Sequence, residues 1–502
     1  MKKALLTFLA ISQCFLFSQN ITGTLGNGGI FKIKDAGNND FLTLSQLNGN
    51  LTLLRNLDLG PDTSAFNHRG VITKGGKRFL HNYQDPNTAG FNLFLGLYSG
   101  NFTLGSPSPL EASYNTGVGF ATLTSLTTGY SNSAFGFRSL WLNTTGYRNS
   151  AYGVQSLMAN TTGYNNCAFG FRSLFTNTLG NSNCAFGFSS LYYNTTGNFN
   201  SAYGNNSLFN NTTGYGNSAF GSEVLYSNST GYRNSGFGTL SLNYNTTGFD
   251  NSAFGYWCMS YNTTGSGNSA FGVGSLYNNM TGYGNSAFGY WALYRTTAGN
   301  YNVAVGDSAG ANISGGSNNI AIGYNALVPN PTSDNQIRLG NTSITYAGIQ
   351  VPWTITSDKR YKYNISPLGL GLNFVTKLNP VSYTRKNDDS KKIEFGLIAQ
   401  EVEQVLNDIG IDNHSMITVT SDGMYELRYN DLIAPMIKAI QELKDELISK
   451  QREISILKEQ YELEINSLKD ENKYIKSEII AIKNELVKIN NQKPQNTIHN
   501  NY

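Results

Sequence analysis

Apolar and polar positions repeat with a strict period through the middle of the chain. One glycine recurs at every seventeenth position, and the residue before it is aromatic or aliphatic in every repeat. The glycines are Gly119, Gly136, Gly153, Gly170, Gly187, Gly204, Gly221, Gly238, Gly255, Gly272, Gly289, Gly306 and Gly323. From Leu140 to Leu293, a second apolar column follows the glycine by four positions. Such a period indicates units that stack, because one insertion would displace every later column.

The segments between the glycines predict strands rather than helices. Ser-Ala-Phe-Gly stretches are too short for helices, and Asn-Thr-Thr-Gly stretches supply residues that tolerate positive φ at corners. The predicted fold class is mainly β, with a β-solenoid or β-roll shaft over residues 116–330 whose core the aromatic and leucine columns close. A disordered tract is the alternative interpretation, but disorder gives no reason to keep aromatic residues in register.

Two segments precede the shaft. Residues 1–18 have a basic start, an apolar run and a small residue at the end, which predicts a signal peptide and hence a secreted or cell-surface protein. Residues 19–115 predict a β-rich region, in which residues 90–101 resemble one degenerate repeat offset by an insertion near Pro107. No later segment is apolar for long enough to predict a transmembrane helix in the mature chain.

The pattern changes again after the shaft. Residues 331–355 predict a short β-rich neck, and charged residues become frequent from Thr356 onward. From Ile440 apolar residues recur every seven positions, which predicts a coiled coil over residues 436–492, with a frayed tail at 493–502. Isoleucine-rich core positions favour trimers over dimers.

Composition limits the chemistry. The net charge is +3 with 13% charged residues, so nucleic acid is not an expected partner. Three cysteines remain after the predicted signal, and they have no metal-ligand spacing. We therefore predict no metal site and no cofactor. The shaft has three acids, Glu223, Asp250 and Asp307, which lie on different repeats and do not predict a glycosidase carboxylate pair.

Four blocks in residues 356–435 resemble the endosialidase-type intramolecular chaperone, the peptidase S74 family. The blocks are Ser357-Asp358-Lys359-Arg360-Tyr361-Lys362-Tyr363-Asn364-Ile365, Leu378-Asn379-Pro380-Val381-Ser382-Tyr383, Phe395-Gly396-Leu397-Ile398-Ala399-Gln400-Glu401-Val402, and Tyr429 with Asp431-Leu432-Ile433. The shaft resembles the stalks of trimeric adhesins and phage fibres. The resemblance implies a tail-fibre or tail-spike-like protein. Within the third block we predict a helix from Phe395 to Leu406 that stops at Gly410.

The resemblance also implies autoproteolysis with a serine nucleophile and a lysine base. By position these roles fall on Ser357 and Lys362, with Thr356 and Asp358 as neighbours of the cleaved bond, on whichever side of Ser357 it lies. A serine hydroxyl becomes a nucleophile when a base takes its proton, and a lysine is a base only when burial or nearby cations favour its neutral form. Without the resemblance, the sequence would favour a simpler interpretation, in which Ser357 caps a helix or turn and Lys362 is a solvated surface charge.

The expected function is a trimeric fibre or adhesin-like protein whose chaperone drives assembly and cuts its own chain once as a serine peptidase. The expected partners are two further copies of the chain and a surface glycan or cell-surface receptor. The alternatives are a glycan-degrading spike enzyme and an uncleaved fibre with the chaperone as a permanent anchor. A tyrosine column either contacts sugars or packs as an aromatic ladder; it comprises Tyr130, Tyr147, Tyr164, Tyr215, Tyr232 and Tyr283.

Overall fold

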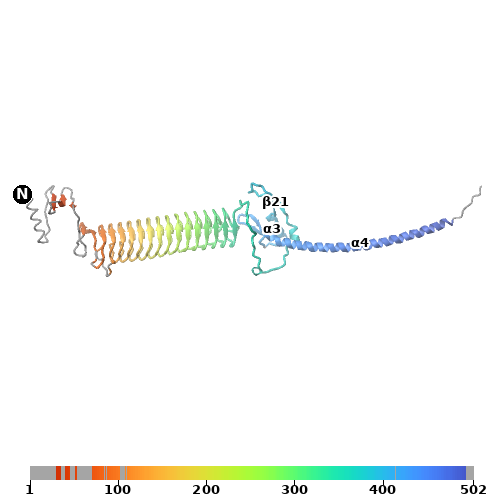
Figure 1. Cartoon of the computed structure of the whole chain (residues 1–502), viewed down its shortest axis with the longest axis horizontal. Helices are drawn as coiled ribbons and strands as arrows, with labels where there is room; N and C mark the ends of the chain where they lie inside the picture. Colours follow the sequence, from red (N-terminus) through yellow and green to blue (C-terminus); the bar gives the residue numbers. More distant parts are fainter. Residues whose placement is uncertain are drawn as a thin grey trace, which may run out of the picture. The chain divides into compact units, whose positions relative to one another are not determined.

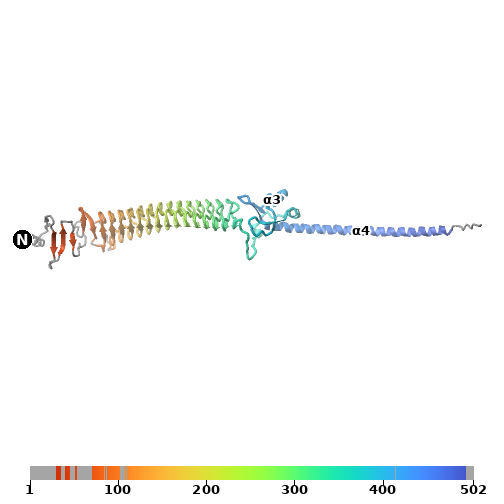
Figure 2. The same ribbon diagram turned by 90° about the horizontal axis from the view of Figure 1, so that it is seen from above.

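The computed structural model describes the backbone of residues 30–34, 40–45 and 51–53, and residues 71–492 except 84, 86, 102–107, 109 and 413. The chain divides into two compact units, Met1–Ser314 and Gly315–Tyr502 (Figures 1 and 2). The predicted signal peptide and the predicted frayed tail lie outside the described residues.

The first unit begins with two small antiparallel arrangements. Strands β1 (Ile30–Lys34), β2 (Asp40–Ser45) and β3 (Leu51–Leu53) form one sheet. Strands β4 (Ile72–Lys74) and β5 (Lys77–His81) form a hairpin, and β5 also pairs with β6 (Leu93–Leu95). Strand β6 pairs in parallel with β7 (Thr116–Val118), and Leu95 lies opposite Val118. These two residues are 23 positions apart, six more than the seventeen of the regular repeat, as an insertion between them requires. The degenerate repeat at 90–101 is therefore confirmed.

A β-solenoid follows, as the repeat predicts. Its strands start at every seventeenth position and pair in parallel, so that Ala168 lies opposite Ala185 and Phe169 opposite Phe186. They are β7 (Thr116–Val118), β8 (Ser133–Phe135), β9 (Ser150–Tyr152), β10 (Cys167–Phe169), β11 (Cys184–Phe186), β12 (Ser201–Tyr203), β13 (Ser218–Phe220), β14 (Ser235–Phe237), β15 (Ser252–Phe254), β16 (Ser269–Phe271), β17 (Ser286–Phe288) and β18 (Val303–Val305). Each repeat is one coil.

The core of the solenoid differs from the prediction. The leucine column is fully buried, but the aromatic column before the glycine is not, and Phe288 is 41% exposed. In most of the three-residue strands the middle residue is an alanine, such as Ala168, that points inward, because successive side chains alternate between the faces of a strand; β7 and β14 have a glycine there. The aromatic rings stack outside the core, with neighbouring centroids 4.5–5.1 Å apart from Phe135 to Phe288. The prediction that both columns close the core is wrong for the aromatic one.

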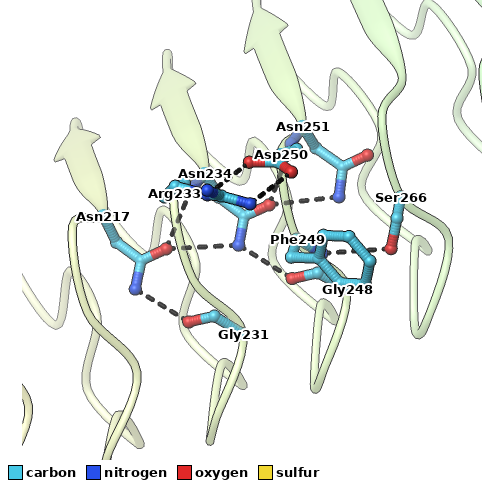
Figure 3. Close-up of polar contacts among 9 residues, drawn as sticks. All are labelled: Asn217, Gly231, Arg233, Asn234, Gly248, Phe249, Asp250, Asn251 and Ser266. Carbon is cyan, nitrogen blue, oxygen red and sulfur yellow. Dashed lines mark hydrogen bonds and ion pairs between the residues drawn. The ribbon is translucent and has the colours of Figure 1, made fainter.

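Two columns of asparagines are also buried in the interior. In the first, Asn234 Nδ2 donates to Asn217 Oδ1 at 3.2 Å and to Gly248 O at 2.8 Å (Figure 3). In the second, Asn228 Nδ2 donates to Asn211 Oδ1 at 2.8 Å. These bonds recur coil after coil, so a polar interior avoids the cost of unpaired buried amides.

The repeated glycine has a steric cause. Gly204 has a φ of +138°, and a Cβ there would lie 2.2 Å from the carbonyl oxygen of Gly221 on the next coil. A side chain would thus meet both an unfavourable backbone conformation and a backbone atom that holds the next coil.

The second unit starts with two further strands of the repeat, β19 (Ile320–Ile322) and β20 (Ile337–Leu339), which pair in parallel. β20 is the one strand within residues 331–355, all of which are described, so the neck holds less strand than predicted. Short elements follow: η1 (Lys359–Tyr361), α2 (Leu372–Val375), β21 (Val381–Tyr383), β22 (Glu394–Gly396), α3 (Ala399–Asp408), β23 (Ile417–Val419), β24 (Tyr425–Leu427) and η2 (Tyr429–Leu432).

The predicted helix from Phe395 to Leu406 begins later in the structure. Phe395 lies in β22, which pairs antiparallel with β21, and the helix α3 starts at Ala399. The apolar periodicity of the helix continues back into the hairpin, which explains the wrong start. Its end is as predicted, because Gly410 has a φ of +78° just beyond the last turn.

A small apolar core holds these elements together. Phe374, Val402, Leu406, Met416 and Leu432 are its buried members. The chain then continues as α4 (Ile433–Asn490), one helix of 58 residues, about 87 Å long (Figure 1). Among the described residues, no helix is both long enough and apolar enough to cross a membrane.

Candidate functional site

A single turn of 3₁₀-helix organises the segment from Ser357 to Lys362. Asp358 caps the turn, since its Oδ1 accepts a hydrogen bond from the Arg360 amide at 2.8 Å. The Lys362 amide donates to the Lys359 carbonyl at 3.0 Å and closes the turn. Aspartate is a favoured cap because its short side chain reaches the free amides of the first turn.

The turn brings the two predicted catalytic side chains together. Lys362 Nζ donates to Ser357 Oγ at 2.6 Å, across five positions of sequence. This is the contact that a lysine base needs in order to take the serine proton. Thr356 precedes the pair as an exposed residue without regular secondary structure.

An unpaired cation such as Arg360 beside Lys362 would favour the neutral form of the lysine. The Arg360 guanidinium binds Asp358 instead, with Nη2 2.7 Å from Oδ2. This bond and the capping bond lower the pKa of Asp358 below its usual range, because both stabilise the carboxylate. Arg360 is therefore neutralised by its neighbour.

Exposure limits what the pair can do within one chain. Ser357 and Lys362 are both exposed to solvent. A solvated ammonium keeps its proton at neutral pH, whereas burial favours the neutral amine that acts as a base. The contact geometry is present in the single chain, and the burial is not.

The other three blocks pack against one another. Tyr429 Oη accepts a hydrogen bond from the Leu397 amide at 2.8 Å, which joins the fourth block to the third. Asn379 Nδ2 donates to Glu401 Oε2 at 3.2 Å, which joins the second block to the third. Together these contacts fix the hairpin β21–β22 against α3 and η2.

One positioning residue had no signal in the sequence. Glu442 lies in α4, and its Oε2 accepts a hydrogen bond from the Leu372 amide at 2.7 Å, so it caps α2 from 70 positions away. A Cβ on Gly371 would lie 2.2 Å from that carboxylate oxygen, so a side chain there would displace the Glu442 carboxylate. The bond to Leu372 lowers the pKa of Glu442. Only the folded contact reveals this role, because a glutamate on a charged helix does not stand out in the sequence.

The surface near the blocks is apolar. An open groove of about 490 Å³ is lined mostly by apolar residues, among them Val375, Leu378, Leu432 and Met436. Phe395 at its edge is 82% exposed. Exposed apolar surface of this kind marks sites of association.

The shaft offers no carboxylate pair among its described residues. Asp250 forms an ion pair with Arg233 at 2.7 Å, and the two side chains lie on neighbouring coils (Figure 3). Within the described part of the chain, no group of three or more His, Cys, Asp or Glu side chains could hold a metal ion. The tyrosine column stacks as a ladder, with Tyr130 and Tyr147 4.8 Å apart and nearly parallel.

Comparison with known proteins identifies one segment. Residues 357–411 match the family described as chaperone of endosialidase, peptidase S74. The match begins at Ser357 and includes the first three blocks, while Tyr429 lies beyond it. No curated protein and no solved structure matched the chain. The family match and the β-solenoid shaft together fit a tail-fibre-like protein that carries a chaperone-of-endosialidase domain.

Proposed function

We propose that this chain is an exported fibre subunit that assembles as a homotrimer through residues 356–435 and α4, and then cleaves itself next to Ser357. The observation that carries the cleavage is the 2.6 Å contact between Lys362 Nζ and Ser357 Oγ at the start of the family match. Export follows from the predicted signal peptide, and sequencing the N-terminus of the secreted protein tests it.

The apolar seam of α4 supports assembly. The apolar side chains that recur at every seventh position from Ile440 are all exposed in the single chain, with exposed fractions from 46% for Ile475 to 67% for Ile440. A lone helix with such a seam leaves its apolar stripe in water, whereas a coiled coil buries it. The isoleucines in the repeat favour three strands.

Assembly supplies what the cleavage site lacks. If the turn around Ser357 packs against a neighbouring chain, Lys362 loses solvent and its neutral form becomes accessible. Cleavage then follows folding, since the geometry of attack is set by the assembled structure. Removal of the chaperone makes refolding along the same route impossible and so gives kinetic stability.

The chemistry is an acyl transfer. Lys362 Nζ takes the hydroxyl proton, and Ser357 Oγ attacks the carbonyl carbon of the bond beside it. The C–N bond breaks, the amine leaves with the proton from Lys362, and water hydrolyses the resulting ester. For the bond before Ser357 this attack forms an open ester of Thr356, whereas for the bond after it Ser357 Oγ would attack its own carbonyl carbon and close a four-membered lactone. The fragment masses distinguish the two bonds.

The test is intact mass spectrometry and gel electrophoresis of the secreted protein beside Ser357→Ala and Lys362→Ala. We expect two fragments from the wild type and an intact chain from both variants. Lys359→Ala and Ser366→Ala are matched controls from the same segment and should cleave as the wild type does.

A wild-type chain that stays whole as a folded trimer would refute cleavage and favour the alternative, a fibre in which the chaperone is a permanent trimeric base. A folded monomer would refute assembly itself. Sedimentation of the Ser357→Ala variant separates these two results, because that variant retains the whole chain.

A further inference from the structure

The early coils of the solenoid carry uncompensated positive charge. Residues 116–222 contain three arginines, Arg138, Arg148 and Arg172, and no lysine, aspartate or glutamate. The next acid in the column of Arg172 is Glu223, which lies three coils later. Three coils correspond to about 14 Å, beyond the physiological Debye length of about 8 Å.

Two of these arginines each lie close to two aromatic rings. The Arg138 guanidinium lies 4.8 Å from the Trp141 ring centroid and 5.2 Å from that of Phe137. Arg172 repeats the arrangement two coils later, 4.9 Å from Phe171 and 5.4 Å from Phe175. Stacking on a ring occupies the face of a guanidinium and leaves its N–H edge available for an anion.

The coil between the two arginines bonds to one of them. Gln155 occupies the same position of the repeat, and its Oε1 accepts a hydrogen bond from Arg172 Nε at 2.8 Å. Arg138 Nε is buried without a hydrogen-bond partner, because the residue one coil earlier is Ala121, which has no acceptor. Across the described residues, the terminal amino groups of Arg138 and Arg172 bond to no carboxylate.

Arg233 shows the contrasting case. It also stacks on an aromatic ring, at 4.9 Å from Tyr232, but Asp250 on the next coil binds its guanidinium (Figure 3). The chain thus satisfies one stacked arginine internally and leaves the Arg138–Arg172 pair without an acid. Arg233 is for that reason a matched control.

Exposed apolar rings border the pair on one side. Phe137 is 41% exposed and Phe171 38%, and they continue in the same column into Phe120 and Phe188, at 39% and 53%. Phe120 stacks on Phe137 and Phe171 on Phe188, which makes flat apolar surface along the coils. Flat rings beside charged donors suit a ligand with apolar C–H faces and anionic groups.

We propose that Arg138, Gln155 and Arg172 form a binding strip for an acidic polysaccharide. The two guanidiniums are two coils apart, about 10 Å, and each can hold one carboxylate by two parallel N–H bonds. Phe137 and Phe171, on the same coils as the two arginines, and Val154, on the coil between them, then contact the apolar faces of the sugar rings. This strip occupies different positions of the repeat from the tyrosine column, and it is independent of cleavage at Ser357.

Binding to immobilised polygalacturonate, hyaluronate, alginate and polysialate tests the proposal, with methyl-esterified polygalacturonate and amylose as neutral counterparts. We expect the purified protein to bind at least one carboxylated polymer and neither neutral polymer. The double variant Arg138→Gln/Arg172→Gln should lose at least about tenfold in affinity, because it removes the charged hydrogen bonds to the carboxylates, and Arg233→Gln should not.

Arg172→Lys tests the geometry of the contact. The variant keeps the positive charge but loses the planar guanidinium that binds a carboxylate through two N–H bonds, so the affinity of this variant should fall between those of the wild type and the double variant. Circular dichroism and thermal unfolding confirm that each variant is folded. Absence of binding to every carboxylated polymer would overturn the proposal. Equal binding to the esterified polymer, or equal binding by the double variant, would overturn it as well.

Discussion

The solenoid and the unit that follows it differ in how far they bury their apolar side chains within one chain. In the solenoid, each coil finds its partners one repeat away in the same chain, and the leucine, alanine and asparagine columns are fully buried. In the second unit, the core has five buried residues, while Phe395 and the whole seam of α4 remain exposed. The shaft buries its apolar columns within one chain, whereas the unit with the chaperone domain leaves an apolar seam exposed.

This difference separates two roles. A stack of coils gains stability from nearest neighbours and has no need of another subunit to close its core. A helix of 58 residues with an exposed apolar stripe gains most of its stability from packing against other helices. The following predictions test each side of the comparison.

The largest loss of stability is expected at a repeated glycine of the shaft that leaves no room for a Cβ atom. Gly204→Ala should lower the free energy of unfolding by about 4 kcal/mol, because the new Cβ would collide with the Gly221 carbonyl at a positive φ. Thermal unfolding of the wild type and the variant measures it. Gly216→Ala is the control: its φ is +65°, but the nearest atom lies 3.6 Å away, so about 1 kcal/mol is expected. Equal losses in the two variants would contradict the steric argument.

The second effect concerns association through α4. Leu468→Asp places a charge in the seam and should cost about 3 kcal/mol per chain in a coiled coil, while the shaft unfolds at an unchanged temperature. Sedimentation measures the loss of oligomer. Lys469→Asp, one position outside the seam, should associate normally. An unaltered oligomer in Leu468→Asp would show that α4 does not hold the chains together.

The third effect is pH-dependent and concerns the start of the shaft. Burial lowers the pKa of His81 from 6.5 to about 4, and its Nε2 lies 2.8 Å from the Ser99 carbonyl oxygen. The unfolded chain therefore binds the proton first, so stability is full above pH 6.5 and falls as the pH drops toward 4, by at most about 3 kcal/mol. Hydrogen exchange of β5 and β6 at pH 7 and pH 4.5 measures it. His81→Gln should lose this dependence; if it keeps it, another group is responsible.

The smallest expected effect is an increase in stability at the end of an asparagine column. The second asparagine column ends at Asn279, whose Oδ1 is buried without a partner because position 296 is threonine. Thr296→Asn should extend the column with an amide that donates to this oxygen, raising the free energy of unfolding by about 1 kcal/mol. Thr296→Val, which cannot donate, serves as the control in the same unfolding measurement. A loss of stability with asparagine would mean that the bond from Thr296 Oγ1 to the Ile313 carbonyl matters more.

The sequence predicted the solenoid because its repeat is visible without knowledge of contacts. It did not predict the composition of the core, since a column of alanines such as Ala168 is inconspicuous beside a column of phenylalanines. The asparagines of the Asn-Thr-Thr-Gly stretches were predicted at corners, although Asn211 and Asn228 bond to each other inside. Which face of a three-residue strand points inward depends on the turns on both sides.

The candidate site divides in the same way. Its residues came from the resemblance, and the capped turn accounts for the contact between Ser357 and Lys362. The role of Glu442 depends on a contact 70 positions away, which no local pattern announces. The burial that would activate Lys362 depends on other chains, and a single sequence does not specify their arrangement.

Because the repeat is uniform, the length of the shaft is set by the number of repeats. Removing or duplicating one whole repeat anywhere between β8 and β17 would restore the repeated backbone, asparagine and leucine contacts across the new junction, because most coils offer their neighbours the same asparagine, leucine and glycine positions. The length would change in steps of about 4.8 Å. A lineage can therefore adjust how far the fibre reaches by unequal recombination alone, without redesigning a single interface.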